Sequence, residues 1–322
     1  MSQPDEPLVI LNPAAGSAHA LDEGRLRAQL TASRLPSVWT ETTPDRGADR
    51  IIRESPHRGA VIVLGGDGTV REAARALRGG DRPLAVVPLG TGNVMALRLD
   101  IPLTVPEALR VVREGVIRRT DLGICKGEPF LLTVGMGIDG LLVRESNRDR
   151  KRQMGKMAYL WSAARNMPVA HHRYQITLDG ETVEEDGASV VVANFGTQVG
   201  PWIFPPDSDG GDGVLDVAVL KAATLEETVS LLAAPFRLKP REHRGLRLYR
   251  AKSVRVECER PVAQQIDGDY IGDASVVEAS IEARSLPVMV STRRPVLQWS
   301  REWPPRGLDW QPWSREEDPD RG

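Results

Sequence analysis

Short runs of consecutive apolar residues alternate with amphipathic segments near the start of this chain. The apolar runs are LVIL at 8–11, AVIVL at 60–64 and LAVVP at 84–88. Helical spacing over 21–33, and again directly after the second run, indicates helices between these strands. Strands that are apolar on both faces are typical of a parallel sheet covered by helices on both sides. The pattern therefore predicts an α/β domain with a parallel sheet.

The pattern changes after about residue 122. Residues 173–179 alternate between apolar and polar, and Asp179-Gly180 is a hairpin turn signal. Further strands are expected at 188–193, 214–220, 253–258 and 275–283, and helices near 154–166 and 224–234. This half is predicted to be a mostly antiparallel second domain. The expected boundaries are 1–122, 123–287, and 288–322 for a return segment with a Trp- and Pro-rich, partly disordered tail.

Each early apolar run ends in a glycine loop. The loops are NPAAG at 12–16, GGDGT at 65–69 and PLGTGN at 88–93. Loops at the carboxyl ends of parallel strands line one crevice, so the three are predicted to converge on one site. Small residues let the backbone approach an anion, and the first amides of the next helix point at it. Neither a Walker A loop nor a G-x-G-x-x-G fingerprint is present at these loops.

The second loop carries a negative charge, Asp67, where phosphate would bind. A carboxylate repels a triphosphate unless a cation lies between them, or unless the carboxylate orients loop amides or a ribose hydroxyl. The charge therefore favours a Mg²⁺–nucleotide complex. The alternative is a tight strand-to-helix turn in which Thr69 is the N-cap and Glu72 its capping-box partner. Asn12 has a similar alternative as part of an Asn-Pro turn.

Two acidic segments lie in the second half. Residues 207–216, DSDGGDGVLD, hold four aspartates among glycines, which suits a Mg²⁺ or Ca²⁺ site or a solvated turn. The spacing is not that of an EF-hand. Residues 264–269, QQIDGD, contain a second Asp-Gly pair, whose simplest interpretation is a hairpin turn.

Composition narrows the function classes. The 322 residues carry a net charge of −2 with a pI near 6.3, which argues against a nucleic-acid partner. Two cysteines are too few for a disulfide framework, so a reduced, cytosolic setting is expected. The chain lacks a recognisable signal peptide and any run near the ~18 apolar residues of a membrane span. Contact with a membrane would therefore be peripheral.

Taken in order, these motifs resemble the diacylglycerol kinase catalytic domain family, which includes bacterial lipid kinases and the sphingosine and ceramide kinases. The resemblance runs from about residue 7 to 290. GGDGT alone is shared with NAD kinases, whereas the ordered series is highly specific. The later motifs that carry the resemblance are TDLG at 120–123, GMGID at 135–139, DGVLD at 212–216 and IDGD at 266–269.

The resemblance implies a Rossmann-like ATP-binding domain, a β-sandwich-like second domain and an active site between them. It also implies a set of nucleotide-contacting residues, with Thr43 as an alternative to Thr42. That set is Asn12, Thr42, Gly65, Gly66, Asp67, Gly68, Thr69, Glu72, Thr91 and Asn93. Asn12 would supply a side-chain amide where no lysine is available.

For the second half, the resemblance implies a structural Mg²⁺ held by Asp209, Asp212 and the carbonyl of Val214, while Asp216 supports the strand. It places the general base at Asp269, where most relatives have Glu. Asp121 is implied as a second acid at the active site, or alternatively ties down the interdomain connection. The fallback bases are Asp267 and Asp273.

The expected activity is ATP- and Mg²⁺-dependent phosphorylation of a lipid hydroxyl, with diacylglycerol converted to phosphatidic acid. Two alternatives stay open: an NAD kinase-like phosphotransferase, and a nucleotide-binding regulator without catalysis. The expected partner is a membrane lipid met peripherally at the cytoplasmic face, with a possible homodimer. Basic stretches at 144–156 and from Arg237 to Arg255 would suit anionic lipid or could be solvated helix faces.

Overall fold

The computed structural model describes residues 6–16, 23–36, 39–149, 170–199, 202–204, 208–221 and 245–292. The described residues form one compact unit. The helices predicted near 154–166 and 224–234, and the Trp-rich tail, lie outside the described residues. Among the helices of the described ranges, none has the length and apolar character needed to cross a bilayer.

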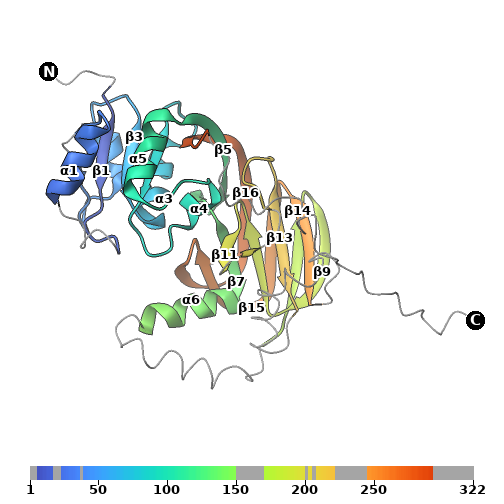
Figure 1. Cartoon of the computed structure of the whole chain (residues 1–322). Coiled ribbons are helices and arrows are strands. Elements are labelled where there is room, and N and C mark those ends of the chain that lie inside the picture. The colour runs from blue at the N-terminus through green and yellow to red at the C-terminus, as the bar shows by residue number, and fades with distance from the viewer. Residues whose placement is uncertain are drawn as a thin grey trace, which may run out of the picture. The chain divides into compact units, whose positions relative to one another are not determined.

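The N-terminal half is built on a parallel sheet (Figure 1). Strand β1 pairs in parallel with β2 and β3, and β3 pairs in parallel with β4. The three predicted apolar strands are thereby confirmed as β1, β3 and β4. The elements of this half are β1 (Leu8–Leu11), α1 (Glu23–Ala32), β2 (Thr40–Glu41), α2 (Ala48–Glu54), β3 (Val61–Gly65), α3 (Asp67–Leu77), β4 (Leu84–Pro88), α4 (Val94–Arg98) and α5 (Val105–Glu114).

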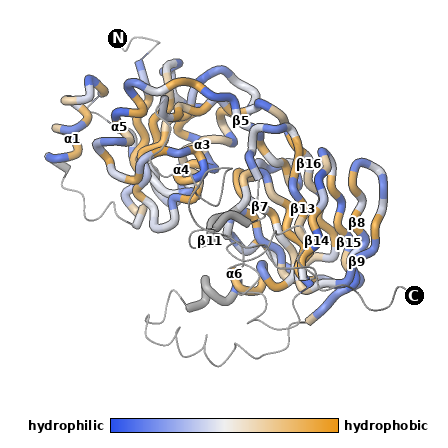
Figure 2. Tube along the Cα trace, turned by 45° about the vertical axis from the view of Figure 1, so that its right-hand side comes forward, coloured by the Kyte–Doolittle hydropathy of each residue, from blue (hydrophilic) through white to orange (hydrophobic). Residues whose placement is uncertain are grey.

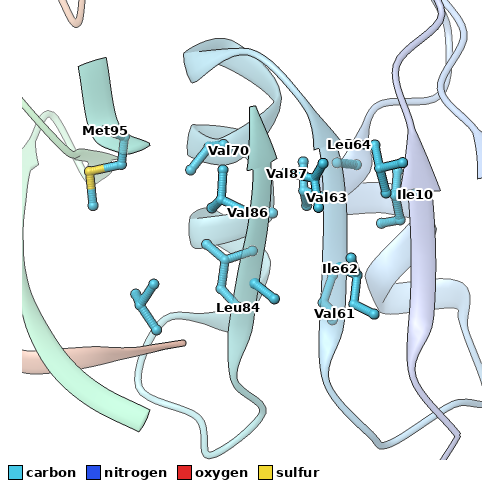
Figure 3. Close-up of a cluster of buried hydrophobic side chains, with 14 of the residues drawn as sticks. Ile10, Val61, Ile62, Val63, Leu64, Val70, Leu84, Val86, Val87 and Met95 are labelled. Carbon is cyan, nitrogen blue, oxygen red and sulfur yellow. The ribbon is translucent and has the colours of Figure 1, made fainter. Parts of the chain in front are cut away.

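The core of this half lies on the parallel strands. Every residue of β1, β3 and β4 is buried, as the uninterrupted apolar runs require. Figure 3 shows side chains of these strands together with Val70 and Met95, from the helices that follow β3 and β4. Burial of each such side chain contributes roughly 1.5–3 kcal/mol. This packing fixes the strands, and therefore the loops at their carboxyl ends.

The second half is antiparallel, as predicted. The turn at Asp179 and Gly180 has φ values of 50° and 97°, which fits the hairpin signal. Its elements are β5 (Val116–Cys125), β6 (Glu128–Phe130), β7 (Thr133–Gly137), α6 (Ile138–Asp149), β8 (His172–Leu178), β9 (Glu181–Gly187), β10 (Ser189–Ala193), β11 (Thr197–Val199), β12 (Trp202–Phe204), β13 (Leu215–Leu220), β14 (Leu246–Ala251), β15 (Ser253–Ile266) and β16 (Asp269–Val290).

Strand β16 joins the two halves. It pairs antiparallel with β15 and β5, and near its end Val288 pairs in parallel with Leu84 of β4. One 14-stranded sheet therefore runs through both halves, in the order β14-β13-β10-β7-β15-β16-β4-β3-β1-β2, with β5, β6, β8 and β9 off this path. Figure 2 shows that β9, which pairs with β8, is largely hydrophilic, a composition that discourages pairing with other chains.

Candidate functional site

The three glycine loops lie against one another, which confirms their predicted convergence. Asn12 of the first loop donates its side-chain amide to the Thr69 hydroxyl of the second, at 2.8 Å. The second and third loops approach so closely that a Cβ on Gly90 would lie 2.6 Å from the Cα of Gly66. Glycine is therefore required at this crossing, and Asn12 has a contact beyond its local turn.

The third loop is shaped by Asn93. This residue adopts a left-handed conformation, with φ 49°. Its side chain accepts a hydrogen bond from the Gly90 amide and donates one to the Gly90 carbonyl, both at 2.7 Å. Thr91 is exposed at the loop tip and faces Gly16 of the first loop, where an added Cβ would lie 2.5 Å from its hydroxyl. Thr91 can therefore reach a ligand, whereas Asn93 holds the loop in shape.

The second loop leads directly into α3, and the helix begins earlier than the capping-box alternative requires. Its N-cap is Gly66, no side chain caps it, and its first turn closes with Val70 N donating to Gly66 O at 3.1 Å. The first amides of a helix lack intrahelical partners and carry partial positive charge. Gly68 is exposed, and a Cβ added there would meet no atom within 4 Å. This terminus thus presents open backbone suited to an anion.

Glu72 caps a different helix from the one expected. Its Oε2 accepts the Ala48 amide at 2.8 Å, at the start of α2, whose N-cap Gly47 offers no side chain. Thr69 is buried in the first turn of α3, and its hydroxyl accepts a hydrogen bond from the Asn12 side-chain amide. The capping-box alternative is therefore wrong. Glu72 instead ties α3 to the segment that follows β2.

The charge of Asp67 is accounted for by the next helix. Its Oδ2 accepts the Val94 amide at 3.1 Å and its Oδ1 accepts the Met95 amide at 2.9 Å. Both oxygens are thus used at the N-terminus of α4, where a carboxylate is favourable. The carboxylate therefore orients backbone amides, as one alternative expected, although these belong to α4 and not to its own loop. The Mg²⁺ interpretation stays a prediction.

An open pocket of about 520 Å³ lies beside α2 and α3, and none of its lining residues belongs to the three glycine loops. Thr42, whose amide donates to Leu11 O at 2.9 Å, precedes it in the chain, and the alternative candidate Thr43 lines it. Glu72 is a further candidate in its wall. The pocket is lined by Thr43, Pro44, Asp45, Gly47, Asp49, Arg50, Arg53, Glu54, Glu72 and Arg75.

Asp269 is brought to α3 by an ion pair. It follows a tight turn in which Asp267 and Gly268 have φ values of 48° and 82°, as the Asp-Gly signal predicts. Its Oδ2 lies 2.6 Å from an Arg71 nitrogen, and Arg71 also donates to the Ile266 carbonyl at 2.9 Å. Sequence reasoning missed Arg71, because a polar residue on an amphipathic helix carries no signal that distinguishes it from a solvated one.

The two fallback acids have other partners. Asp267 accepts the backbone amides of Leu131, Leu132 and Thr133 at 2.8–3.0 Å, and burial raises the pKa of its carboxyl in spite of them. It therefore anchors the turn to the start of β7. Asp273 accepts the Tyr270 hydroxyl at 2.8 Å.

Asp121 lies inside the protein. Its side chain is buried, and its oxygens accept the amides of Gly213 and Arg284, both at 2.7 Å. These bonds join β5 to the acidic loop and to β16, which is the tie-down role that the sequence left open. No hydrogen bond or ion pair with Asp269 is found among the described residues, so a role of Asp121 in the chemistry stays a prediction.

The acidic loop is neutralised by arginine. Asp212 accepts the Val214 amide at 3.3 Å through Oδ1, and its Oδ2 pairs with the Arg250 guanidinium, whose Nε lies 3.0 Å from Asp216. Asp209 is exposed. The described residues contain no cluster of three or more His, Cys, Asp or Glu side chains arranged for a metal. These residues do not fit Mg²⁺ while Arg250 holds this position, and the expected site stays a prediction.

Glycine loops that meet at an open helix terminus are features of nucleotide-binding α/β proteins. Residues 6–125 match the family described as the diacylglycerol kinase catalytic domain. Residues 132–290 match the YegS C-terminal NAD kinase beta sandwich-like domain.

A protein of Mycobacterium tuberculosis named "Diacylglycerol kinase" is 31% identical over 73% of this chain and 77% of its own. A "Probable lipid kinase YegS-like" of Pseudomonas aeruginosa is 32% identical over 66% of this chain and 71% of its own. A Synechocystis protein is 28% identical, and the match spans only 55% of its length. The chain belongs to the diacylglycerol kinase family of lipid kinases.

The crystal structure of a diacylglycerol kinase from Bacillus anthracis has the same fold. Its TM-score is 0.71 at 23% identity, over 91% of this chain and 99% of that one. The α/β half with parallel strands and the antiparallel second half are thus the architecture of a known structure.

Proposed function

We propose that this protein is an ATP-dependent lipid kinase that transfers the γ-phosphoryl group to the hydroxyl of diacylglycerol and forms phosphatidic acid. The observation that carries the proposal is the link between Arg71 and Asp269. Through this link, a candidate base is held by the same helix whose open N-terminus lies among the glycine loops. Membership of the lipid kinase family supports the reaction class.

In this proposal the loops bind the triphosphate. The open amides at the start of α3 would donate to phosphate oxygens, and Gly68 would let the nucleotide approach the backbone. Thr91 would contact the nucleotide from the third loop, and Thr42 or Thr43 from the segment after β2. Mg²⁺ bound with ATP would neutralise charge on the β and γ oxygens, as in other phosphoryl transfers.

Asp269 is the proposed general base. Its carboxylate would accept the proton of the lipid hydroxyl while the new oxygen–phosphorus bond forms and the bond to ADP breaks. Its side chain is 60% exposed, so a substrate can reach it. Aspartate is one methylene shorter than the glutamate that the family resemblance implies at this position, so the carboxylate would have to come closer or act through water.

The substrate would be met at a membrane surface by peripheral contact. Of the two basic stretches, the part that the structure describes includes Arg144, which lies over the Tyr270 ring at 5.9 Å, next to the turn that presents Asp269. Arg144 is already in an ion pair with Asp273 at 3.6 Å, and Arg250, in the other stretch, is paired with Asp212. Attraction to anionic lipid would therefore have to compete with these pairs. The cytoplasmic face and a possible homodimer belong to the same proposal.

The test is a radiolabelled ATP assay with diacylglycerol vesicles, a mixed bacterial lipid extract and NAD in parallel. We expect labelled phosphatidic acid. Labelled NADP would establish the NAD kinase-like alternative, and no label with any acceptor would favour a regulator. Label in another lipid of the extract, with none in diacylglycerol, would replace the proposed substrate.

The base is tested in the same assay with a matched pair of variants. D269N should lower the rate at least about 100-fold, within the usual contribution of a general base. D273N, a change of the same kind on the same strand, should not. The reverse result would move the base to Asp273.

A further inference from the structure

Helix α3 and its C-cap contact the second half of the molecule through a row of arginines, defined here as Arg71 and Arg75 of the helix and Arg78 at the C-cap. Arg75 pairs with Glu128 of β6 at 2.5 Å. Arg78 donates to both carboxylate oxygens of Glu282 on β16. Arg71 pairs with Asp269, the first residue of β16. The same helix thus has the open N-terminus that suits a phosphate group, and it also makes contacts to the opposite half.

Arg71 differs from the other two in what it holds. Its guanidinium spans the turn, because one nitrogen binds the Ile266 carbonyl before the turn and another binds the Asp269 carboxylate after it. The Arg71 side chain is only 21% exposed, whereas Asp269 is 60% exposed. An exposed carboxylate has rotamer freedom, so its location is set by the less exposed partner. A planar guanidinium fixes direction as well as distance.

We propose that Arg71 is a positioning residue for the base: it holds the short carboxylate of Asp269 at a fixed place relative to the glycine loops. This inference rests on the proposed lipid kinase function. Because α3 would also provide the amides that bind phosphate, one rigid helix would fix the positions of both the phosphate group and the base. The reaction geometry then depends on one helix and not on closure of two independent halves.

The test compares R71M, R71K and R78M with the wild type in steady-state kinetics, varying ATP and diacylglycerol separately. R71M removes the clamp and should lower kcat at least about tenfold, with the KM for ATP within about twofold, because misplacement of a reacting group acts on the chemical step. R71K keeps the positive charge but lacks the two-pronged guanidinium, so its kcat should lie between those of R71M and the wild type.

R78M is the matched control. It removes an arginine–carboxylate pair between the C-cap of the same helix and the same strand without touching Asp269, and it should keep kcat and both KM values within about twofold. Melting temperatures of R71M and R78M should fall by similar amounts. A loss of kcat that is equal in the two variants would assign Arg71 a merely structural role and overturn the inference.

Two further outcomes are decisive. A raised KM for ATP with unchanged kcat in R71M would make Arg71 a nucleotide-binding residue, contrary to the inference. Wild-type kinetics in R71M would also overturn it while leaving the lipid kinase activity established. Absence of lipid phosphorylation by the wild type would overturn the proposed function itself, so the two failures are distinguishable.

Discussion

Gly68 offers a perturbation in which stability and function should move in opposite directions. It lies in the first turn of α3, its φ is not left-handed, and an added Cβ would meet no protein atom within 4 Å. Alanine is a better helix residue than glycine by about 0.5–1 kcal/mol. G68A should therefore raise the free energy of unfolding by that amount and the melting temperature by about 1 to 3 °C.

The same methyl group would occupy the space in which a triphosphate must approach the backbone. We expect G68A to weaken the binding of Mg²⁺–ATP at least tenfold, which corresponds to about 1.4 kcal/mol. The assay is thermal unfolding together with calorimetric titration of Mg²⁺–ATP and, separately, of adenosine, whose binding should change much less. If G68A bound Mg²⁺–ATP with wild-type affinity, the nucleotide would not lie against this turn, and the assignment of the glycine loops would fail.

Three further changes test the surroundings of the site. D67A should stay folded, at a cost of about 0.5–2 kcal/mol for the lost cap of α4, but should lose phosphoryl transfer. D67N keeps one of the two hydrogen-bond acceptors and should lose less of this activity. Equal losses of activity in the two variants would assign the role of Asp67 to its charge. EDTA should leave the wild-type melting temperature unchanged, because Arg250 already pairs with Asp212. Mg²⁺ should raise the melting temperature only of R250M, in which Asp212 has lost this partner. A lower wild-type melting temperature in EDTA would contradict this. The Arg78 hydrogen bond lowers the pKa of Glu282, so E282Q should cost about 0.5–1 kcal/mol at pH 7. That difference should shrink as the pH falls below the ordinary glutamate pKa of about 4.3 and disappear once the pH is below the lowered pKa of Glu282, because the stabilisation is lost as the carboxylate protonates. A difference that stayed constant in melts from pH 7 down to about pH 2 would refute the assignment.

The elements of the parallel sheet could be predicted almost to the residue, because buried strands of this kind are continuous apolar runs. The strand expected at 84–88 is Leu84–Pro88, and that expected at 8–11 is Leu8–Leu11. Strand β16 was expected only at 275–283, whereas it covers Asp269–Val290. The residues before 275 alternate only between exposed and half-buried positions, and Pro287 lies among the mostly buried residues after 284. Neither end therefore shows the alternation of apolar and polar residues that marks a strand.

The loops of the candidate site were also predictable, because glycine at the end of an apolar run is a local signal. The roles of individual side chains within them were less so. Glu72 follows Thr69 at capping-box spacing, yet it caps α2. Arg71 and Asp269 are 198 positions apart, and their contact depends on where two halves of the chain meet. Local patterns carry no information on such pairs.

Strand β16 also has a consequence for how the protein is made. Val288 supplies the neighbour of Leu84 at one side of β4, a strand completed 200 positions earlier, at Pro88. During synthesis, the nucleotide half leaves the ribosome long before β16 has been made. Until then, the edge of β4 that pairs with Val288 lacks that strand partner. A ribosome that stalls short of residue 288 would leave both halves unfinished, and quality-control proteases would meet that nascent chain as a single substrate.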